Sequence, residues 1–165
     1  MVTWFGFLLA VIAAVLILTR HLFAAGLLVV IAGFFDILDG ALARHTNQTT
    51  RFGTILDATL DRLSEGVVLL SILAFLYANE QAVAQILLVC VALLGSLLVS
   101  YLRARMEAIG IKCPVGLFTR SERVIVLALG LLLNQITIAL GIIAVFSFIT
   151  VGQRLLYAWK QTRSR

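Results

Sequence analysis

Six long apolar runs, separated by short polar breaks, fill almost the whole of this chain. A membrane-spanning helix needs about 17 to 25 mostly apolar residues. Charged side chains make up only 13% of the sequence, which is far below a soluble domain. We therefore predict an all-α integral membrane protein, with one domain over residues 1–165 and six transmembrane helices. The runs cover residues 2–19, 22–43, 53–77, 82–105, 118–134 and 136–157.

The break at Asn134 and Gln135 is the weakest, because residues 124–151 alone would also make one long tilted helix. The basic residues favour six spans. With a cytoplasmic start, twelve of the 13 lysines and arginines fall on one side and only Arg20 on the other, as the positive-inside rule requires. A five-span chain would put the basic C-terminus on the wrong side. We predict six spans, with both termini in the cytoplasm.

The formal net charge of +5 is also explained by this topology. Basic residues beside membrane helices set orientation and contact anionic headgroups. We therefore expect membrane lipids as partners and no nucleic acid.

Four aspartates interrupt the apolar pattern at one end of two neighbouring spans. Asp36 and Asp39 stand three residues apart, and Asp57 and Asp61 four apart, so each pair shares a helix face. Each such carboxylate costs roughly 2.5 to 3.5 kcal/mol on insertion scales. Consecutive spans run antiparallel, so the two faces can converge at one depth. Oxygen ligands of this kind suit magnesium, manganese or calcium, and we predict a cytoplasm-facing polar metal cavity with room for two ions.

The residues around these acids favour catalysis over ion storage. Gly40 and Gly53 leave the backbone open to a ligand, and Arg44 offers a planar fork of donors for phosphate oxygens. A metal, a bare backbone and an arginine together indicate a pyrophosphate site. A divalent-cation transporter is the competing class, because acids within a membrane often mark ion pathways. It gives no reason for the two glycines and the arginine.

Residues 36–61 fit the pattern DxxDGxxARx8GxxxDxxxD at every fixed position. This pattern resembles the signature of the CDP-alcohol phosphotransferase family, whose architecture also has six spans. The resemblance implies that an alcohol attacks the β-phosphorus of a CDP-linked lipid such as CDP-diacylglycerol, releasing CMP. It further implies a homodimer in the cell (inner) membrane, with the active site facing the cytoplasm.

The resemblance also assigns roles to residues. Asp36, Asp39 and Asp57 would hold Mg²⁺ or Mn²⁺ as two ions, with Asp61 near the second ion. Asp61 would be the catalytic residue that accepts the proton of the attacking hydroxyl. The CDP pyrophosphate and nucleotide would be contacted by Gly40, Arg44 and Gly53.

One family feature is missing from the start of the chain. Members usually carry an interfacial helix before the first span, often ending in a Pro-Asn-x-x-Thr turn. Here Met1 lies almost at that turn and Thr3 is its remnant. We therefore expect either that the N-terminal interfacial helix is absent or that the given start lies downstream of the true one.

Residues 100–123, with the stretches SYLRAR and SER, are the part of the sequence that indicates the acceptor alcohol. They resemble the branch of the family that uses inositol phosphate, including phosphatidylinositol-phosphate synthases. On that resemblance Arg103, Arg123 and Arg154 would clamp the acceptor phosphate. Glycerol 3-phosphate stays open, as in phosphatidylglycerophosphate synthases, because it is also an anion.

Two further acidic residues are predicted to interact with neighbouring side chains. Glu65 lies one turn beyond Asp61, and we expect it either to support the metal site or to pair with Arg62. Glu122 precedes Arg123, and we expect it to orient that arginine.

Overall fold

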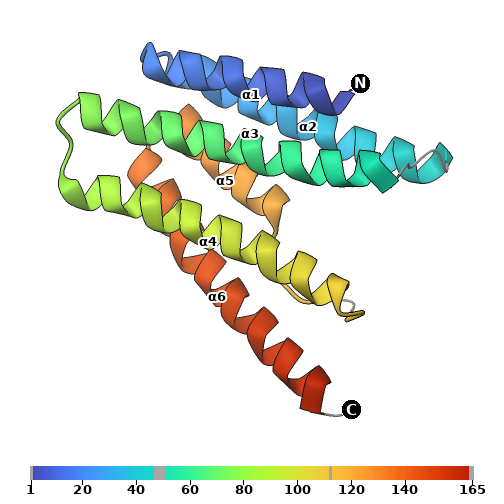
Figure 1. Cartoon of the computed structure of the whole chain (residues 1–165). Helices are drawn as coiled ribbons and strands as arrows, with labels where there is room; N and C mark the ends of the chain where they lie inside the picture. The colour runs from blue at the N-terminus through green and yellow to red at the C-terminus, as the bar shows by residue number, and fades with distance from the viewer. Residues whose placement is uncertain (1, 47–50, 112, 164–165) are drawn as a thin grey trace.

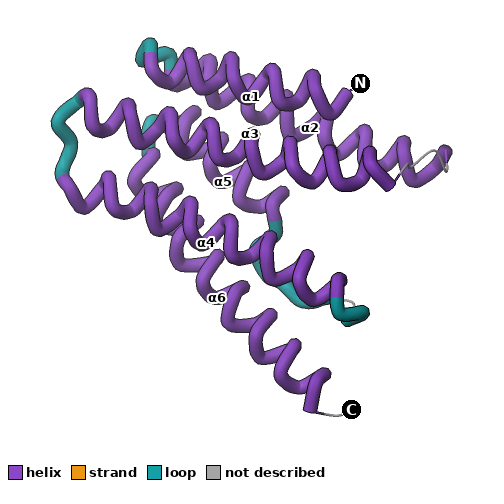
Figure 2. Tube along the Cα trace, in the orientation of Figure 1, coloured by secondary structure: helices purple, strands orange, loops and turns teal. Residues whose placement is uncertain are grey.

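The computed structural model describes residues 2–46, 51–111 and 113–163, and side chains within 4–35, 52–111 and 113–163. In these ranges the chain is all-helical, without strands (Figures 1 and 2). The prediction of six helices is confirmed. The helices are α1 (Val2–Leu18), α2 (Leu22–Thr46), α3 (Arg51–Ala78), α4 (Val83–Ala108), α5 (Arg120–Leu132) and α6 (Ile136–Arg163).

The doubtful break at Asn134 is a true turn. α5 ends at Leu132, and Asn134 takes a left-handed conformation with φ of 54° before α6 begins. The amide of Gln135 donates to the carbonyl of Gly130 across 2.8 Å. This six-to-one hydrogen bond closes the helix end and stops α5 from continuing. The alternative of one long helix is wrong.

The other two turns at this end of the bundle use the same device. Arg20 and Glu80 are left-handed, with φ of 66° and 52°. The next residue in each case, His21 or Gln81, donates its amide to the carbonyl five positions back. Three helix ends thus close alike without glycine, although glycine is the usual residue there.

Successive helices run in opposite directions, so both termini lie at one end of the bundle (Figure 1). α1 packs against α2 and α3, α2 packs on α5, and α4 and α6 form the most extensive pair. The last turns of α6 extend beyond the other helices. The end of α2, the start of α3, the end of α4 and the start of α5 lie at the same end of the bundle as the termini, which brings the acidic and basic segments of the sequence together.

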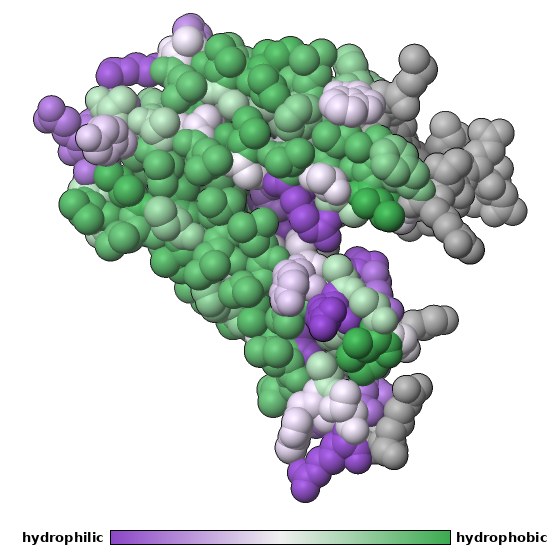
Figure 3. Space-filling model, in the orientation of Figure 1, coloured by the Kyte–Doolittle hydropathy of each residue, from purple (hydrophilic) through white to green (hydrophobic). Residues whose placement is uncertain are grey.

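The core combines small and large apolar residues, and further large apolar side chains face outward. Ala13, Ala25 and Ala92 are fully buried together with Ile72 and Leu140, whereas Leu87 and Val145 are exposed. Small residues such as these alanines let membrane helices approach closely. α4 and α6 are each long and apolar enough to cross a membrane. Figure 3 shows the mostly hydrophobic surface, with hydrophilic residues gathered in a hollow toward the end that holds the termini.

Gly130 marks the closest approach of α5 and α6. A Cβ added there would lie 2.3 Å from the Cβ of Ala139. We expect Gly130→Ala to force the helices apart and to lower the free energy of unfolding by about 1–3 kcal/mol, measured by thermal denaturation in detergent. Gly141→Ala is the matched control, since nothing lies within 4 Å of its added Cβ. Equal melting temperatures for the two variants would contradict the close packing.

Candidate functional site

Three acidic side chains line one face of α3. Asp57, Asp61 and Glu65 follow one another at intervals of four residues, and all three border a cavity between α1, α2, α3 and α5. Their exposure falls along the helix: Asp57 is exposed, Asp61 is half-buried and Glu65 is buried. The acidic face therefore runs from the surface into the bundle. This confirms that Asp57 and Asp61 share a face.

Two arginines on α5 meet this acidic face. An Arg120 Nη1 to Asp61 Oδ2 distance of 2.9 Å makes one ion pair. Arg123 forms the other, donating from Nε and Nη2 to the two carboxylate oxygens of Glu65 at 2.7 and 3.0 Å. The Arg123 and Glu65 side chains are only 1% and 6% exposed. A buried bidentate pair of this kind fixes the register of α5 against α3.

The first turn of α5 is held by its own cap. The amide of Thr119 donates to Glu122 Oε2 at 2.8 Å, and the Thr119 hydroxyl also contacts that carboxylate. This is a capping box, which satisfies amides that the helix leaves free. It sets where α5 begins, and with it the positions of Arg120 and Arg123.

One expectation about these acidic residues is wrong, and the metal-site alternative for Glu65 stays a prediction. Glu65 pairs with Arg123 rather than with Arg62, whose guanidinium instead donates to the carbonyl of Ala58. Glu122 bonds to Thr119 at the start of α5 rather than to the Arg123 side chain, so it acts on Arg123 through the position of the helix. The partner of Glu65 lies 58 residues away in sequence, beyond the reach of helix-neighbour reasoning.

The other half of the predicted metal site lies outside the described side chains. Asp36, Asp39, Gly40 and Arg44 belong to the last turns of α2, of which the backbone alone is described. The convergence of the two aspartate pairs therefore stays a prediction. Gly53 lies in the first turn of α3, partly exposed.

The described half fits a divalent cation. Asp57 and Asp61 present carboxylate oxygens one turn apart on a cavity wall, and hard oxygen donors are the ligands that Mg²⁺ and Mn²⁺ prefer. Among the described side chains no group of three acids, histidines or cysteines is placed to hold a metal ion. The contribution of the α2 aspartates to the ligand set stays a prediction.

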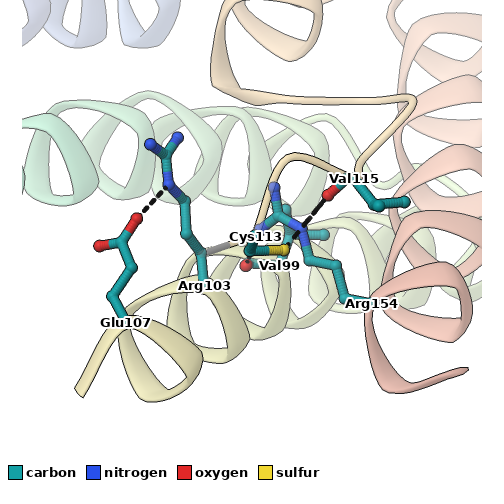
Figure 4. Close-up of polar contacts among 6 residues, drawn as sticks. All are labelled: Val99, Arg103, Glu107, Cys113, Val115 and Arg154. Carbon is teal, nitrogen blue, oxygen red and sulfur yellow. Dashed lines mark hydrogen bonds and ion pairs between the residues drawn. The ribbon is translucent and has the colours of Figure 1, made fainter. Parts of the chain in front are cut away.

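The three predicted acceptor arginines differ in their surroundings. Arg103 is 58% exposed and pairs with Glu107 at 2.9 Å. Arg154 is buried, and from α6 it donates to the carbonyl of Val99 in α4 and, at 3.2 Å, to that of Val115 in the α4–α5 connection (Figure 4). Arg123 is paired with Glu65. Only Arg103 is thus without a role in packing.

The segment before α5 is fastened to α6 by several contacts. Besides the Arg154 bond, the amide of Phe118 donates to Thr150 Oγ1 at 3.1 Å and that of Leu117 to Gln153 Oε1 at 3.2 Å. At Gly116, with φ of 156°, an added Cβ would lie 2.8 Å from the Arg154 guanidinium. Arg154 therefore holds this connection in place.

The arginines nevertheless act on one another. The positive charges of Arg103 and Arg123 both oppose that of Arg154. Arg123 Nη1 is buried and has no hydrogen-bond partner among the described residues. Positive charges gathered from α4, α5 and α6 are relieved when an anion binds among them. Arg103 and Arg123 are each paired with a glutamate, so the binding of an anionic ligand by the cluster formed by Arg103, Arg123 and Arg154 stays a prediction.

An acidic cavity and an arginine cluster at one end of an apolar helical bundle define a membrane enzyme that handles phosphorylated substrates. A family model described as CDP-alcohol phosphatidyltransferase matches residues 1–152. The chain belongs to this family and is a transferase of phospholipid biosynthesis. The chemistry of the family uses divalent cations such as Mg²⁺ or Mn²⁺.

Its relatives include two synthases of inositol-phosphate lipids. The archaetidylinositol phosphate synthase of Methanothermobacter thermautotrophicus is 36% identical over 168 residues, which cover 98% of this chain and 83% of the relative. The phosphatidylinositol phosphate synthase of Corynebacterium glutamicum is 40% identical over 158 residues, covering 90% of this chain and 71% of the relative.

Solved structures share the fold. The Mycobacterium tuberculosis phosphatidylinositol phosphate synthase with CDP-DAG bound has a TM-score of 0.86 and 33% identity, covering 96% of this chain and 84% of that one. The same enzyme in complex with manganese and citrate has a TM-score of 0.85 and 34% identity, covering 96% of this chain and 80% of that one.

Proposed function

We propose that this protein transfers a phosphatidyl-type group from a CDP-linked lipid, such as CDP-diacylglycerol, to inositol phosphate and releases CMP. One observation carries this proposal: the acidic face of α3 is joined directly, through Asp61 and Arg120, to the helix that bears Arg123 of the arginine cluster. A metal-bound pyrophosphate and an anionic acceptor would thus meet at one place. The names of the relatives agree with this acceptor.

The acids would hold the divalent cations. We infer that Asp36, Asp39, Asp57 and Asp61 bind two ions, Mg²⁺ or Mn²⁺. When bound, the ions supply positive charge to the pyrophosphate oxygens and polarise the attacking hydroxyl. Asp61 then accepts the proton of the acceptor hydroxyl, because it lies deeper than Asp57 on the side that faces α5. The proposed base would then lie between Asp57 and the arginines of α5.

The nucleotide end of the lipid would lie over the α2–α3 connection. Gly40 and Gly53 allow its pyrophosphate to approach the backbone, and Arg44 donates to phosphate oxygens. The CMP leaving group carries the negative charge that develops when the bond to the β-phosphorus breaks. Electrostatic stabilisation of that charge is the main task of this side of the site.

The bundle would cross the membrane six times. α4 and α6 meet the length and hydropathy of a span, and α1 and the first part of α2 are shorter apolar helices. We infer that the end with the termini faces the cytoplasm in the cell (inner) membrane, because Arg20 is the sole basic residue assigned to the opposite end. A homodimer is part of the same proposal, by analogy with the family.

The function is tested by CMP release from CDP-diacylglycerol in detergent with Mg²⁺ or Mn²⁺. We expect release with myo-inositol 1-phosphate and little with inositol or serine, because the arginine cluster needs an anion. Faster release with glycerol 3-phosphate would assign the protein to that acceptor instead. No release with any of the four acceptors would overturn the proposal.

Arg103 offers the sharpest test of the acceptor site, because it has no packing role. We expect Arg103→Gln to raise the KM for inositol phosphate about tenfold, as for the loss of one charge-assisted hydrogen bond. The KM for the CDP-lipid should change little. Arg105→Gln is the control, since this exposed residue lies on the opposite face of α4. Equal effects on both substrates would indicate a general electrostatic role for Arg103.

A further inference from the structure

α3 and α5 face each other across the cavity and are joined by side chains. α5 packs its backbone mainly on α2 and α6, and α3 on α1 and α4. Between α3 and α5 stand the two ion pairs, Asp61 with Arg120 and Glu65 with Arg123. The deeper pair is almost fully buried. The Asp61 and Arg120 side chains are 21% and 28% exposed, so the outer pair is open to solvent and to ions.

In the outer pair the Arg120 guanidinium occupies the carboxylate of Asp61, which the proposed function assigns to a divalent metal ion. Arg120 Nη1 lies 2.9 Å from Asp61 Oδ2, and both residues line the cavity with Asp57. A carboxylate that holds a guanidinium at this distance has one lone-pair direction occupied. A divalent ion beside it would also be repelled by the arginine charge. The two cations therefore compete for Asp61.

Arg120 has space into which it can withdraw. It lines the acidic cavity and also a second, apolar cavity between α2 and α5, bordered by Gly33, Phe34 and Val124. The Glu65–Arg123 pair lies one turn deeper and does not depend on the outer pair. α5 can thus keep its place while the Arg120 side chain moves.

We propose that Arg120 is a positioning residue that serves as the resident counter-cation of Asp61, and that a divalent cation enters by displacing its guanidinium from this carboxylate. The inference rests on the proposed metal role of Asp61. Without metal the arginine holds the carboxylate in place on the cavity wall. With metal the guanidinium is released from the carboxylate.

The test measures the affinity of the substrate-free protein for Mn²⁺ in detergent. The concentration of free Mn²⁺ is monitored by its electron paramagnetic resonance signal. We expect Arg120→Gln to bind Mn²⁺ about fivefold more tightly, the affinity gained when a partly exposed pair worth about 1 kcal/mol no longer competes. Arg120→Lys keeps the charge and should stay close to the wild type. Arg120→Met is a second charge-free variant in case the glutamine protein does not fold.

Arg62→Gln is the matched control. It removes the same charge next to Asp61 in sequence, but the Arg62 guanidinium bonds to the carbonyl of Ala58. Its effect on Mn²⁺ affinity measures the long-range field alone and should be smaller than that of Arg120→Gln. Equal effects in the two variants, or weaker binding by Arg120→Gln, would overturn displacement and leave the metal site intact. Absence of Mn²⁺ binding by the wild type and by both charge-free variants would instead refute the metal role and the inference with it.

Discussion

Asp57→Asn should abolish CMP release while leaving the protein folded. Asp57 is exposed at the mouth of the acidic cavity, so the fold does not need its charge. A neutral amide is a much weaker ligand for a hard divalent cation than a carboxylate. We expect the turnover rate to fall by more than about 100-fold, since even residues behind a ligand are worth 10- to 100-fold. The melting temperature in detergent should match that of the wild type.

Thr59→Ala is the control for this experiment. Thr59 is exposed, two residues further along α3, and its hydroxyl donates to the carbonyl of Ile55 at 2.8 Å. It therefore faces away from the cavity, and its loss should leave turnover unchanged. If Asp57→Asn turns over at the wild-type rate, Asp57 is not a metal ligand.

Arg123→Ala should have the largest effect on stability. It leaves the Glu65 carboxylate in the bundle without its bidentate partner, and removal of one member of a buried pair costs about 3–5 kcal/mol. Thermal denaturation in detergent would show this as a large drop in melting temperature. The exposed Arg103 is the comparison, because Arg103→Ala breaks a surface pair worth at most about 1 kcal/mol.

The double variant Glu65→Met with Arg123→Met separates a lost partner from lost packing. It removes both charges and keeps the cavity filled, so most of the stability should return. A stable Arg123→Ala protein would show that the Glu65–Arg123 pair does not join α3 to α5.

The course of the chain was readable from its sequence because hydropathy and charge both report on it. The polar breaks placed all six helices, and the break at Asn134 was resolved by the basic C-terminus alone. The shape of the turns was not readable. Arg20, Glu80 and Asn134 close their helices in left-handed conformations, and Arg20 and Glu80 carry no sign of this in their residue type.

The sequence predicted the site only in part, because local spacing does not determine contacts between distant residues. The spacing of Asp57 and Asp61 fixes a shared helix face, because that is a local property. The partners of Asp61 and Glu65 depend on how α5 packs across the cavity. Two local signals were available: the i, i+3 spacing of Arg120 and Arg123, and the Thr119-x-x-Glu122 capping box that starts α5. The first puts the two arginines on one face of a helix, but neither identifies their partners.

The central claim is that aspartates of α2 and α3 hold divalent cations between them. Anomalous diffraction at the manganese edge, from crystals of this protein grown with Mn²⁺, tests it most directly. We predict anomalous peaks bounded by the carboxylates of Asp36, Asp39, Asp57 and Asp61. Manganese bound elsewhere, with the carboxylates of α2 turned away from Asp57 and Asp61, would contradict the claim.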